Sequence, residues 1–303
     1  MRTIKNRERL ACLGVIFVNI CWGLSFIGSK KAMNAGFLPF SLVTVRFLVS
    51  SAVLLPVALL KKVSLRMAKK DITILILASL SGVTVYFFFE LNGLKHTSAA
   101  TASLIIAAIP ALTMLVSVVV HKKKLSLLSW AGAIVSLIGV YMVVASDGSA
   151  DTVKGAMYMF GACGCWVTYM ELSNILLKKY SSLCVTLWQS VVSLISLVPL
   201  CFTEDVAWSG VGLEAWLWAS VFLGFICSAL CYILYNHSIS VLAPVRTAIF
   251  LNLNPIAAVV GGMILLGEKL VLKQYIGGVI ILVSLYLVTR FGDKKAKEAQ
   301  KNV

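Results

Sequence analysis

Ten long apolar stretches follow one another along the chain, separated by short polar segments. An α-helix needs about 20 residues to cross the roughly 30 Å hydrocarbon core of a bilayer, and each stretch is close to that length. The composition agrees, because 60% of the residues are hydrophobic and only 13% are charged, whereas about a quarter are charged in soluble proteins. We therefore predict an all-α membrane protein with ten transmembrane helices. The expected helices cover residues 10–32, 38–60, 72–93, 98–120, 127–146, 154–177, 182–202, 214–236, 242–266 and 272–291.

Basic residues are distributed unevenly between the two sides of these predicted helices. With both termini in the cytoplasm, nineteen of the 27 Lys and Arg residues fall in cytoplasmic segments and six fall in external ones. Such an excess is what the positive-inside rule describes. The bias also supports the number of helices, because omitting one helix would move every later loop to the other side. We predict a multi-pass protein of the plasma (inner) membrane with both termini cytoplasmic.

Other features of the sequence argue against several classes of protein. The net charge of +15 comes from residues in short loops, not from a basic patch with aromatic residues that stack on bases, so we expect no nucleic-acid partner. The eight cysteines form no C-x-x-C pair, and the three histidines fall at different helix ends, so we expect no metal site. No H-E-x-x-H, G-x-S-x-G or P-loop sequence occurs. We therefore expect no catalytic residues, no cofactor and no direct use of ATP.

The two halves of the chain match when one is shifted by about 145 residues. The clearest matches are Cys21-Trp22 with Cys165-Trp166 and Ile109-Pro110-Ala111 with Asn254-Pro255-Ile256. Each half holds an odd number of predicted helices, so the second half must be inserted upside down relative to the first. Inverted repeats are typical of secondary transporters, with the substrate bound near the midplane of the membrane. A scaffold or a channel built by the same duplication is the alternative.

We accordingly divide the chain into three parts. The first five-helix repeat covers residues 10–146, and the second, inverted repeat covers residues 154–291. Residues 292–303 form a basic tail that we expect in the cytoplasm.

Several short motifs resemble those of the EamA family in the drug/metabolite transporter superfamily. They are Trp22-Gly23, Arg46-Phe47, residues 93–100 running into Pro110, Asn254-Pro255, Gly267-Glu268-Lys269-Leu270 and Gln274-Tyr275-Ile276-Gly277. The resemblance covers nearly the whole chain and implies two five-helix repeats that carry amino acids or related metabolites. The chain departs from the family pattern at two places. Lys123 occupies the family's acidic position in the first half, and Glu171 stands where an apolar residue is more usual.

Four charged residues lie inside the predicted helices, namely Arg46, Glu90, Glu171 and Arg246. A charge at the bilayer centre costs about 2.5–3.5 kcal/mol on insertion scales, so each should face a partner, water or substrate. Either arginine could hold a carboxylate or phosphate through two parallel hydrogen bonds, although Arg246 could instead extend to the interface. Removal from water favours the neutral form of a carboxyl group, so Glu90 or Glu171 could exchange a proton during transport. Structural ion pairs among the four residues are the alternative.

Prolines and polar or aromatic residues supply the other candidates for the transport site. Pro110 and Pro255 each remove a backbone hydrogen bond within a helix, and we interpret them as paired hinges or cavity walls. Asn252 and Asn254 could satisfy the backbone freed by Pro255, or contact the substrate. The aromatic and amide residues expected around a central cavity are Asn19, Trp22, Tyr86, Trp166, Tyr169, Trp188, Gln189, Tyr232, Tyr235 and Asn236. Packing is the alternative role for each of them.

The favoured function is a secondary transporter that exports small organic metabolites such as amino acids by alternating access. A drug or organic-cation efflux carrier is the alternative within transport, with the membrane carboxylates as its binding charges. A membrane-embedded enzyme would require catalytic groups clustered at one depth, and no such cluster occurs in the sequence. The partners expected are a small-molecule substrate, the lipid bilayer and a coupling proton, whereas the sequence does not determine the oligomeric state.

Overall fold

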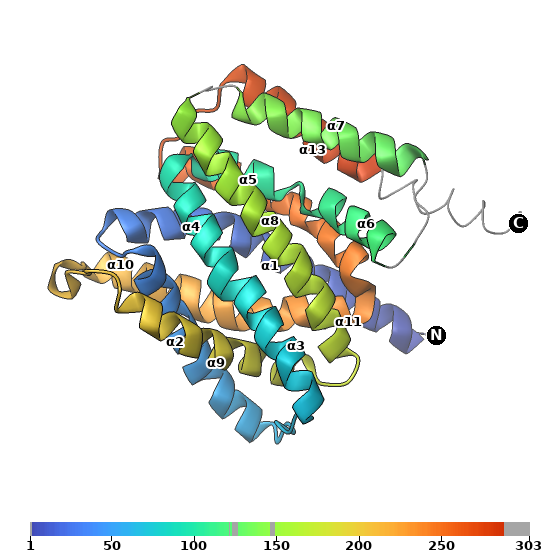
Figure 1. The fold of residues 1–303 in the computed structure, drawn as a ribbon, viewed down its shortest axis with the longest axis vertical. Helices are drawn as coiled ribbons and strands as arrows, with labels where there is room; N and C mark the ends of the chain where they lie inside the picture. Colours follow the sequence, from blue (N-terminus) through green and yellow to red (C-terminus); the bar gives the residue numbers. More distant parts are fainter. Residues whose placement is uncertain (1, 121, 123–126, 146–148, 288–303) are drawn as a thin grey trace, which may run out of the picture.

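The computed structural model describes residues 2–120, 122, 127–145 and 149–287. All regular secondary structure in these residues is helical (Figure 1), which confirms the all-α prediction. Lys123 and the expected tail at residues 292–303 lie outside the described residues.

In the first half of the chain, two of the expected helices are divided into shorter segments. The third expected helix combines α3, η1 and α4 in one continuous run, in which η1 is a π-helix. The elements of this half are α1 (Arg2–Asn34), α2 (Pro39–Leu60), α3 (Lys69–Ser79), η1 (Leu80–Val85), α4 (Tyr86–His96), α5 (Ala99–Ile106), α6 (Ile109–Val119) and α7 (Leu127–Val144).

The second half repeats this pattern. Its π-helix, η3, again lies within a longer run, and the short segments η2 and η4 are 3-10 helices. The elements of this half are α8 (Ala150–Leu177), α9 (Ser182–Cys201), η2 (Trp208–Gly210), α10 (Leu213–Leu217), η3 (Trp218–Leu230), α11 (Cys231–Ala248), η4 (Ile249–Asn252), α12 (Leu253–Leu265) and α13 (Leu272–Leu287).

Local sequence explains where several helices begin and end. Ser98, Ser149 and Ser181 each precede a helix, and their side chains accept a hydrogen bond from a backbone N–H of the first turn, as N-cap serines do. Within α11, Ala243 has a φ angle of +65° directly before Pro244, and the residue before a proline is disfavoured in the α conformation. This break separates the eighth expected helix from the ninth.

Six helical stretches among the described residues are long and apolar enough to cross a membrane. They are Arg7–Asn34, Pro39–Leu60, Lys69–His96, Ala99–Val119, Ser182–Cys201 and Leu213–Ala248. Shorter apolar helices cover Trp130–Val144, Phe250–Leu265 and Leu272–Ser284. The chain is thus an all-helical membrane protein, whereas the number of ten crossings stays a prediction.

The helices pack mainly as pairs drawn from the two halves. α2 packs against α9, α1 against α12, and α4 against α8. α7 and α13 lie side by side along one edge of the bundle (Figure 1). Large apolar side chains cover much of the exposed surface, as a lipid-facing surface requires, and one continuous core cluster joins the two halves.

Gly23 allows a close crossing between α1 and α12. A Cβ atom at Gly23 would lie 2.5 Å from the carbonyl oxygen of Asn254 and 2.7 Å from the Cβ atom of Ala257. Neither atom lies at the end of a flexible side chain, so the two helices must separate to make room.

We predict that Gly23→Ala lowers the melting temperature in detergent, because overpacking of this kind costs about 1–3 kcal/mol. Gly164→Ala in α8 is the matched control, since a Cβ atom there meets nothing within 4 Å. Its melting temperature should stay the same or rise, because alanine favours a helix over glycine by up to about 1 kcal/mol. Equal melting temperatures for both variants and the parent protein would contradict the close crossing.

Candidate functional site

A small cavity lies among the central helices and receives residues from both halves of the chain. The space open to the centre of a water molecule is about 30 Å³, which is room for one or two waters but not for an organic solute. The residues that line it are Trp22, Ser25, Phe26, Arg46, Tyr86, Phe87, Glu90, Ile106, Ile109, Trp166, Tyr232, Leu251 and Asn254. Seven of the residues predicted for the transport site are therefore together in one place: Trp22, Arg46, Tyr86, Glu90, Trp166, Tyr232 and Asn254.

Arg46 of α2 is almost completely buried, with 1% of its surface exposed. Its Nε donates a hydrogen bond to the Oγ of Ser228 at 3.2 Å, and its guanidinium lies 4.4 Å from the centre of the Phe87 ring. The Nη1 atom is buried without a hydrogen-bond partner. The stacking on Phe87 offsets part of the desolvation cost of the cation, while Nη1 keeps its donor capacity for a ligand.

Glu90 of α4 contributes the opposite charge to the same cavity. Its carboxylate interacts with Tyr86, which lies one helical turn earlier, but its Oε1 atom is buried without a hydrogen-bond partner. Both Glu90 and Arg46 are described residues, and no ion pair within 4 Å joins them. The two charges therefore face one cavity without neutralising each other directly.

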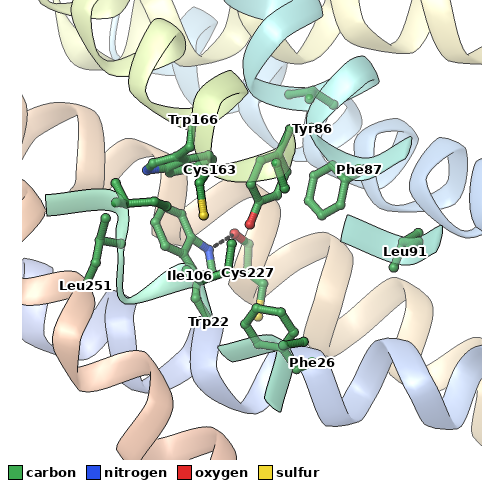
Figure 2. Close-up of a cluster of buried hydrophobic side chains, with 14 of the residues drawn as sticks. Trp22, Phe26, Tyr86, Phe87, Leu91, Ile106, Cys163, Trp166, Cys227 and Leu251 are labelled. Atoms are coloured by element: carbon green, nitrogen blue, oxygen red, sulfur yellow. Dashed lines mark hydrogen bonds between the residues drawn. The ribbon is translucent and has the colours of Figure 1, made fainter. Parts of the chain in front are cut away.

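Trp22 and Trp166, which match in the internal repeat, meet at the cavity wall. Their ring centres lie 5.1 Å apart in an edge-to-face arrangement, a favourable geometry for aromatic pairs. The indole N–H of Trp22 donates to the carbonyl of Cys227 at 3.0 Å (Figure 2). The indole N–H of Trp166 points elsewhere and donates to the hydroxyl of Tyr235 at 3.2 Å. Both rings are thus held by hydrogen bonds as well as by packing.

The two π-helical segments lie directly beside the cavity. Tyr86 follows η1 and Tyr232 follows the end of η3. The hydroxyl of Tyr232 donates to the carbonyl of Gly82 in η1 at 3.3 Å, whereas Trp22 donates to a carbonyl of η3. Each widened segment is therefore bonded to an aromatic residue from the other half. π-helical turns are uncommon and occur often at functional sites.

The two candidate prolines begin new helical segments. Pro110 lies in the first turn of α6, after a break at residues 107–108, and Pro255 lies in the first turn of α12, after the 3-10 helix η4. Proline is well accommodated there because the first N–H groups of a helix have no intrahelical partner.

Residues beside both breaks face the cavity. Ile106 and Ile109 flank the first break, and Leu251 and Asn254 flank the second. The Oδ1 atoms of Asn252 and Asn254 are buried without hydrogen-bond partners. Asn254 lines the cavity, so its free acceptor is available to a ligand.

Gln189 of α9 belongs to a separate polar cluster, which we call the amide cluster. Its Oε1 accepts from Asn236 at 3.0 Å and its Nε2 donates to Ser173 at 2.8 Å. Asn236 also donates to Thr186 at 2.8 Å and accepts from the hydroxyl of Tyr169 at 2.9 Å. The ring of Tyr169 also packs against the ring of Trp166, with 4.9 Å between the two ring centres. The amide groups are internally satisfied, in contrast to the polar atoms of the cavity.

Two of the four charges expected inside the membrane lie away from the cavity. Glu171 is partly exposed on α8. Arg246 is exposed near the end of α11, with its Nη1 at 3.9 Å from the Oε1 of Glu8.

The sequence did not single out Ser25, Phe26, Phe87 or Ser228. Phe87 lies three residues before Glu90, so the helical repeat alone places it on the same face. Ser228 comes from a distant helix, and no local pattern indicates its contact with Arg46.

Comparisons with known proteins point to transporters of one family. A family model described as "EamA-like transporter family" matches residues 9–145 and 153–290. An "Uncharacterized transporter" of Archaeoglobus fulgidus is 26% identical over 270 residues, which cover 89% of this chain and 95% of the relative. A "Probable terminal-alkyne amino-acid exporter" of Streptantibioticus cattleyicolor is 25% identical over 233 residues, which cover 76% of this chain and 77% of the relative.

A solved crystal structure agrees in fold. It superposes with a TM-score of 0.70 at 20% identity and covers 94% of this chain and 98% of the other.

The family and the names of the relatives describe transporters and not enzymes. Because the family model matches nearly the whole length, the resemblance found in the motifs is confirmed. The chain belongs to the EamA-like transporter family, within the drug/metabolite transporter superfamily.

Proposed function

We propose that the protein is a secondary carrier that exports small zwitterionic metabolites such as amino acids across the plasma membrane. One observation carries the proposal. Three buried atoms without hydrogen-bond partners, Arg46 Nη1, Glu90 Oε1 and Asn254 Oδ1, belong to residues that line the same cavity.

The chemistry of these atoms complements a zwitterion. Leaving a buried polar atom unpaired costs about 1–3 kcal/mol, and more for a charged group, so a ligand that pairs all three atoms gains that free energy. A substrate carboxylate can accept from the Arg46 guanidinium. A substrate ammonium can donate to Glu90 and Asn254. The aromatic wall formed by Trp22, Trp166 and Tyr232 would then contact the apolar part of the substrate.

The packing between the halves supports two inverted five-helix repeats and ten crossings. α2 packs against its repeat counterpart α9, and α7 packs against its counterpart α13. The contact of α4 with α8 has an equivalent in the contact of α11 with α1, because α11 is the repeat counterpart of α4 and α1 is that of α8. Trp22 and Trp166 touch each other, as equivalent residues do near a two-fold axis. Opposite orientation of the halves follows from the odd number of helices in each, and the excess of Lys and Arg on the side of the termini supports a cytoplasmic position for both ends.

The small size of the cavity supports alternating access. A space of about 30 Å³ cannot admit an amino acid, so the helices around it must separate to bind and release the substrate. The breaks beside Pro110 and Pro255, and the π-helical segments, give the surrounding helices places at which they can bend. Glu90 is the candidate for proton exchange because it is the carboxylate among the described residues that line the cavity.

An organic-cation exporter is the second candidate. Glu90 together with Trp22, Trp166 and Tyr232 provides a carboxylate and aromatic faces, which attract organic cations. The guanidinium of Arg46 in the same cavity repels a cation, so the zwitterion is favoured.

We predict that Arg46→Gln weakens amino-acid transport by purified protein in liposomes. The substitution removes a charge-assisted interaction, and we expect the apparent affinity to fall by about ten- to one-hundredfold. Arg66→Gln is the matched control, because Arg66 is exposed in the segment between α2 and α3, and it should transport like the parent. A cation exporter would instead keep or increase its transport when Arg46 is removed, and that result would contradict the zwitterion proposal.

We predict that Glu90→Gln abolishes the response of transport to an imposed pH gradient, because glutamine cannot exchange a proton. Glu171→Gln should respond like the parent protein, since Glu171 does not line the cavity. Uptake of a radiolabelled amino acid into vesicles with different internal pH values measures this response. If Glu90→Gln retains the full response, the proton is carried by another group.

A further inference from the structure

We infer that two carboxylates of the second half, Glu204 and Glu268, hold the cavity closed at one end of the bundle by capping helices of the first half. We call this end the outer end, where α1 and α4 finish and α2 and α5 begin. The inference rests on the proposed alternating-access function and concerns residues that do not touch the cavity.

Glu204 lies shortly after α9 and caps α2. Its two carboxylate oxygens accept hydrogen bonds from the backbone N–H groups of Phe40 at 2.9 Å and Ser41 at 2.7 Å. The first N–H groups of a helix lack intrahelical acceptors, and the positive end of the helix dipole favours a carboxylate. Glu204, a residue of the second half, therefore pairs two backbone N–H groups that belong to the first half.

Glu268 makes the same kind of contact with α5. Its carboxylate accepts from the N–H groups of Ala99 at 3.0 Å and Ala100 at 3.2 Å. It also pairs with the Nζ of Lys30 at 3.3 Å, and Lys30 in turn donates to the carbonyl of Thr97 at 3.2 Å. The preceding Gly267 has a φ angle of +65°, which glycine adopts without strain, so the turn can direct Glu268 to the helix end.

The helices held in this way are those that line the cavity. α2 carries Arg46 less than two turns beyond the N–H groups bound by Glu204, and α5 ends at the cavity residue Ile106. Lys30 is one turn beyond the cavity residue Phe26 on α1. A movement that opens the cavity toward the outer end must separate these first-half helices from the second half, and so must break the capping contacts.

The opposite end is held by different contacts. There Asp71 of α3 accepts from the Nζ of Lys179 and the hydroxyl of Tyr180, both at 2.7 Å. The internal repeat matches Glu268 with Lys123, which lies outside the described residues and whose cationic side chain has no acceptor for backbone N–H groups. Among the described residues, the contacts named at the two ends therefore differ: carboxylates cap the starts of helices at the outer end, whereas at the other end Asp71 pairs with side chains.

The test uses a cysteine reporter in the cavity. The eight native cysteines are replaced by alanine, and Ser25, a buried cavity residue, is replaced by cysteine as a close isostere. The rate at which a membrane-impermeant maleimide, added from the outer side of oriented vesicles without substrate, labels this cysteine reports opening toward the outer end.

We expect Glu268→Gln and Glu204→Gln each to raise the labelling rate about five- to thirtyfold, because a neutral amide has one acceptor oxygen and no charge for the helix end. Combining them should raise it further. Glu214→Gln is the matched control, since Glu214 is an exposed carboxylate at the same end, 3.8 Å from Lys31, and should label like the reporter protein.

Hydrogen exchange gives a second measurement on the protein with its native cysteines. The N–H groups of Ala99 and Ala100 should exchange faster in Glu268→Gln, and those of Phe40 and Ser41 in Glu204→Gln. If Glu268→Gln does not fold, Glu268→Asp, whose shorter side chain cannot reach both amides, replaces it in both experiments.

Unchanged labelling in both variants, or an equal increase in Glu214→Gln, would overturn the inference. Failure of the proposed function is separable, because labelling is measured without substrate. If the protein transports no amino acid but shows the expected labelling, the proposed substrate is wrong and the capping inference stands.

Discussion

The structure depends on the cost of leaving polar atoms unpaired where water is excluded. In the amide cluster this cost is avoided, since Gln189, Asn236 and Tyr169 bond to one another and to neighbouring hydroxyl groups. The cavity differs, because Arg46, Glu90 and Asn254 each retain an unpaired atom there. A direct Arg46–Glu90 ion pair would satisfy two of them, yet the two residues remain apart. This contrast indicates that a polar ligand gains the most binding free energy in the cavity, where it can pair these atoms.

Hydrogen bonds between the two halves also reach the backbone of the π-helical segments. Trp22 bonds to a carbonyl of η3, and Tyr232 bonds to a carbonyl of η1. Trp22 and Tyr232 line the cavity, so these bonds tie the π-helical backbone to the cavity wall. A change in the cavity can therefore act on both π-helical segments at once.

Sequence reasoning succeeds here where the signal is local or repeated. Long apolar stretches predict the helices, and the recurrence of Cys-Trp brings Trp22 and Trp166 into one site. Rarity of charge in the membrane selects Arg46 and Glu90, and both line the cavity. The same criterion also selects Glu171, which lies five residues after Trp166 and so faces another side of α8, since five residues turn a helix by about 140° past a full turn.

Other features depend on contacts between distant segments. The bond of Arg46 to Ser228 and the caps formed by Glu204 and Glu268 join residues more than 160 positions apart, and no local pattern encodes them. The π-helical segments are equally hidden, because each lies within a single long apolar stretch of the sequence. The family motif drew attention to Glu268, but its capping of α5 required the structure.

The central claim is that Arg46, Glu90 and Asn254 together bind a zwitterion between the two halves. An experimental structure of the protein in lipid nanodiscs, determined with a transported amino acid, tests it most directly. The account predicts the substrate carboxylate at the Arg46 guanidinium and the ammonium at Glu90 and Asn254. A substrate bound elsewhere in the bundle, or a direct Arg46–Glu90 ion pair in the substrate-bound protein, would contradict it.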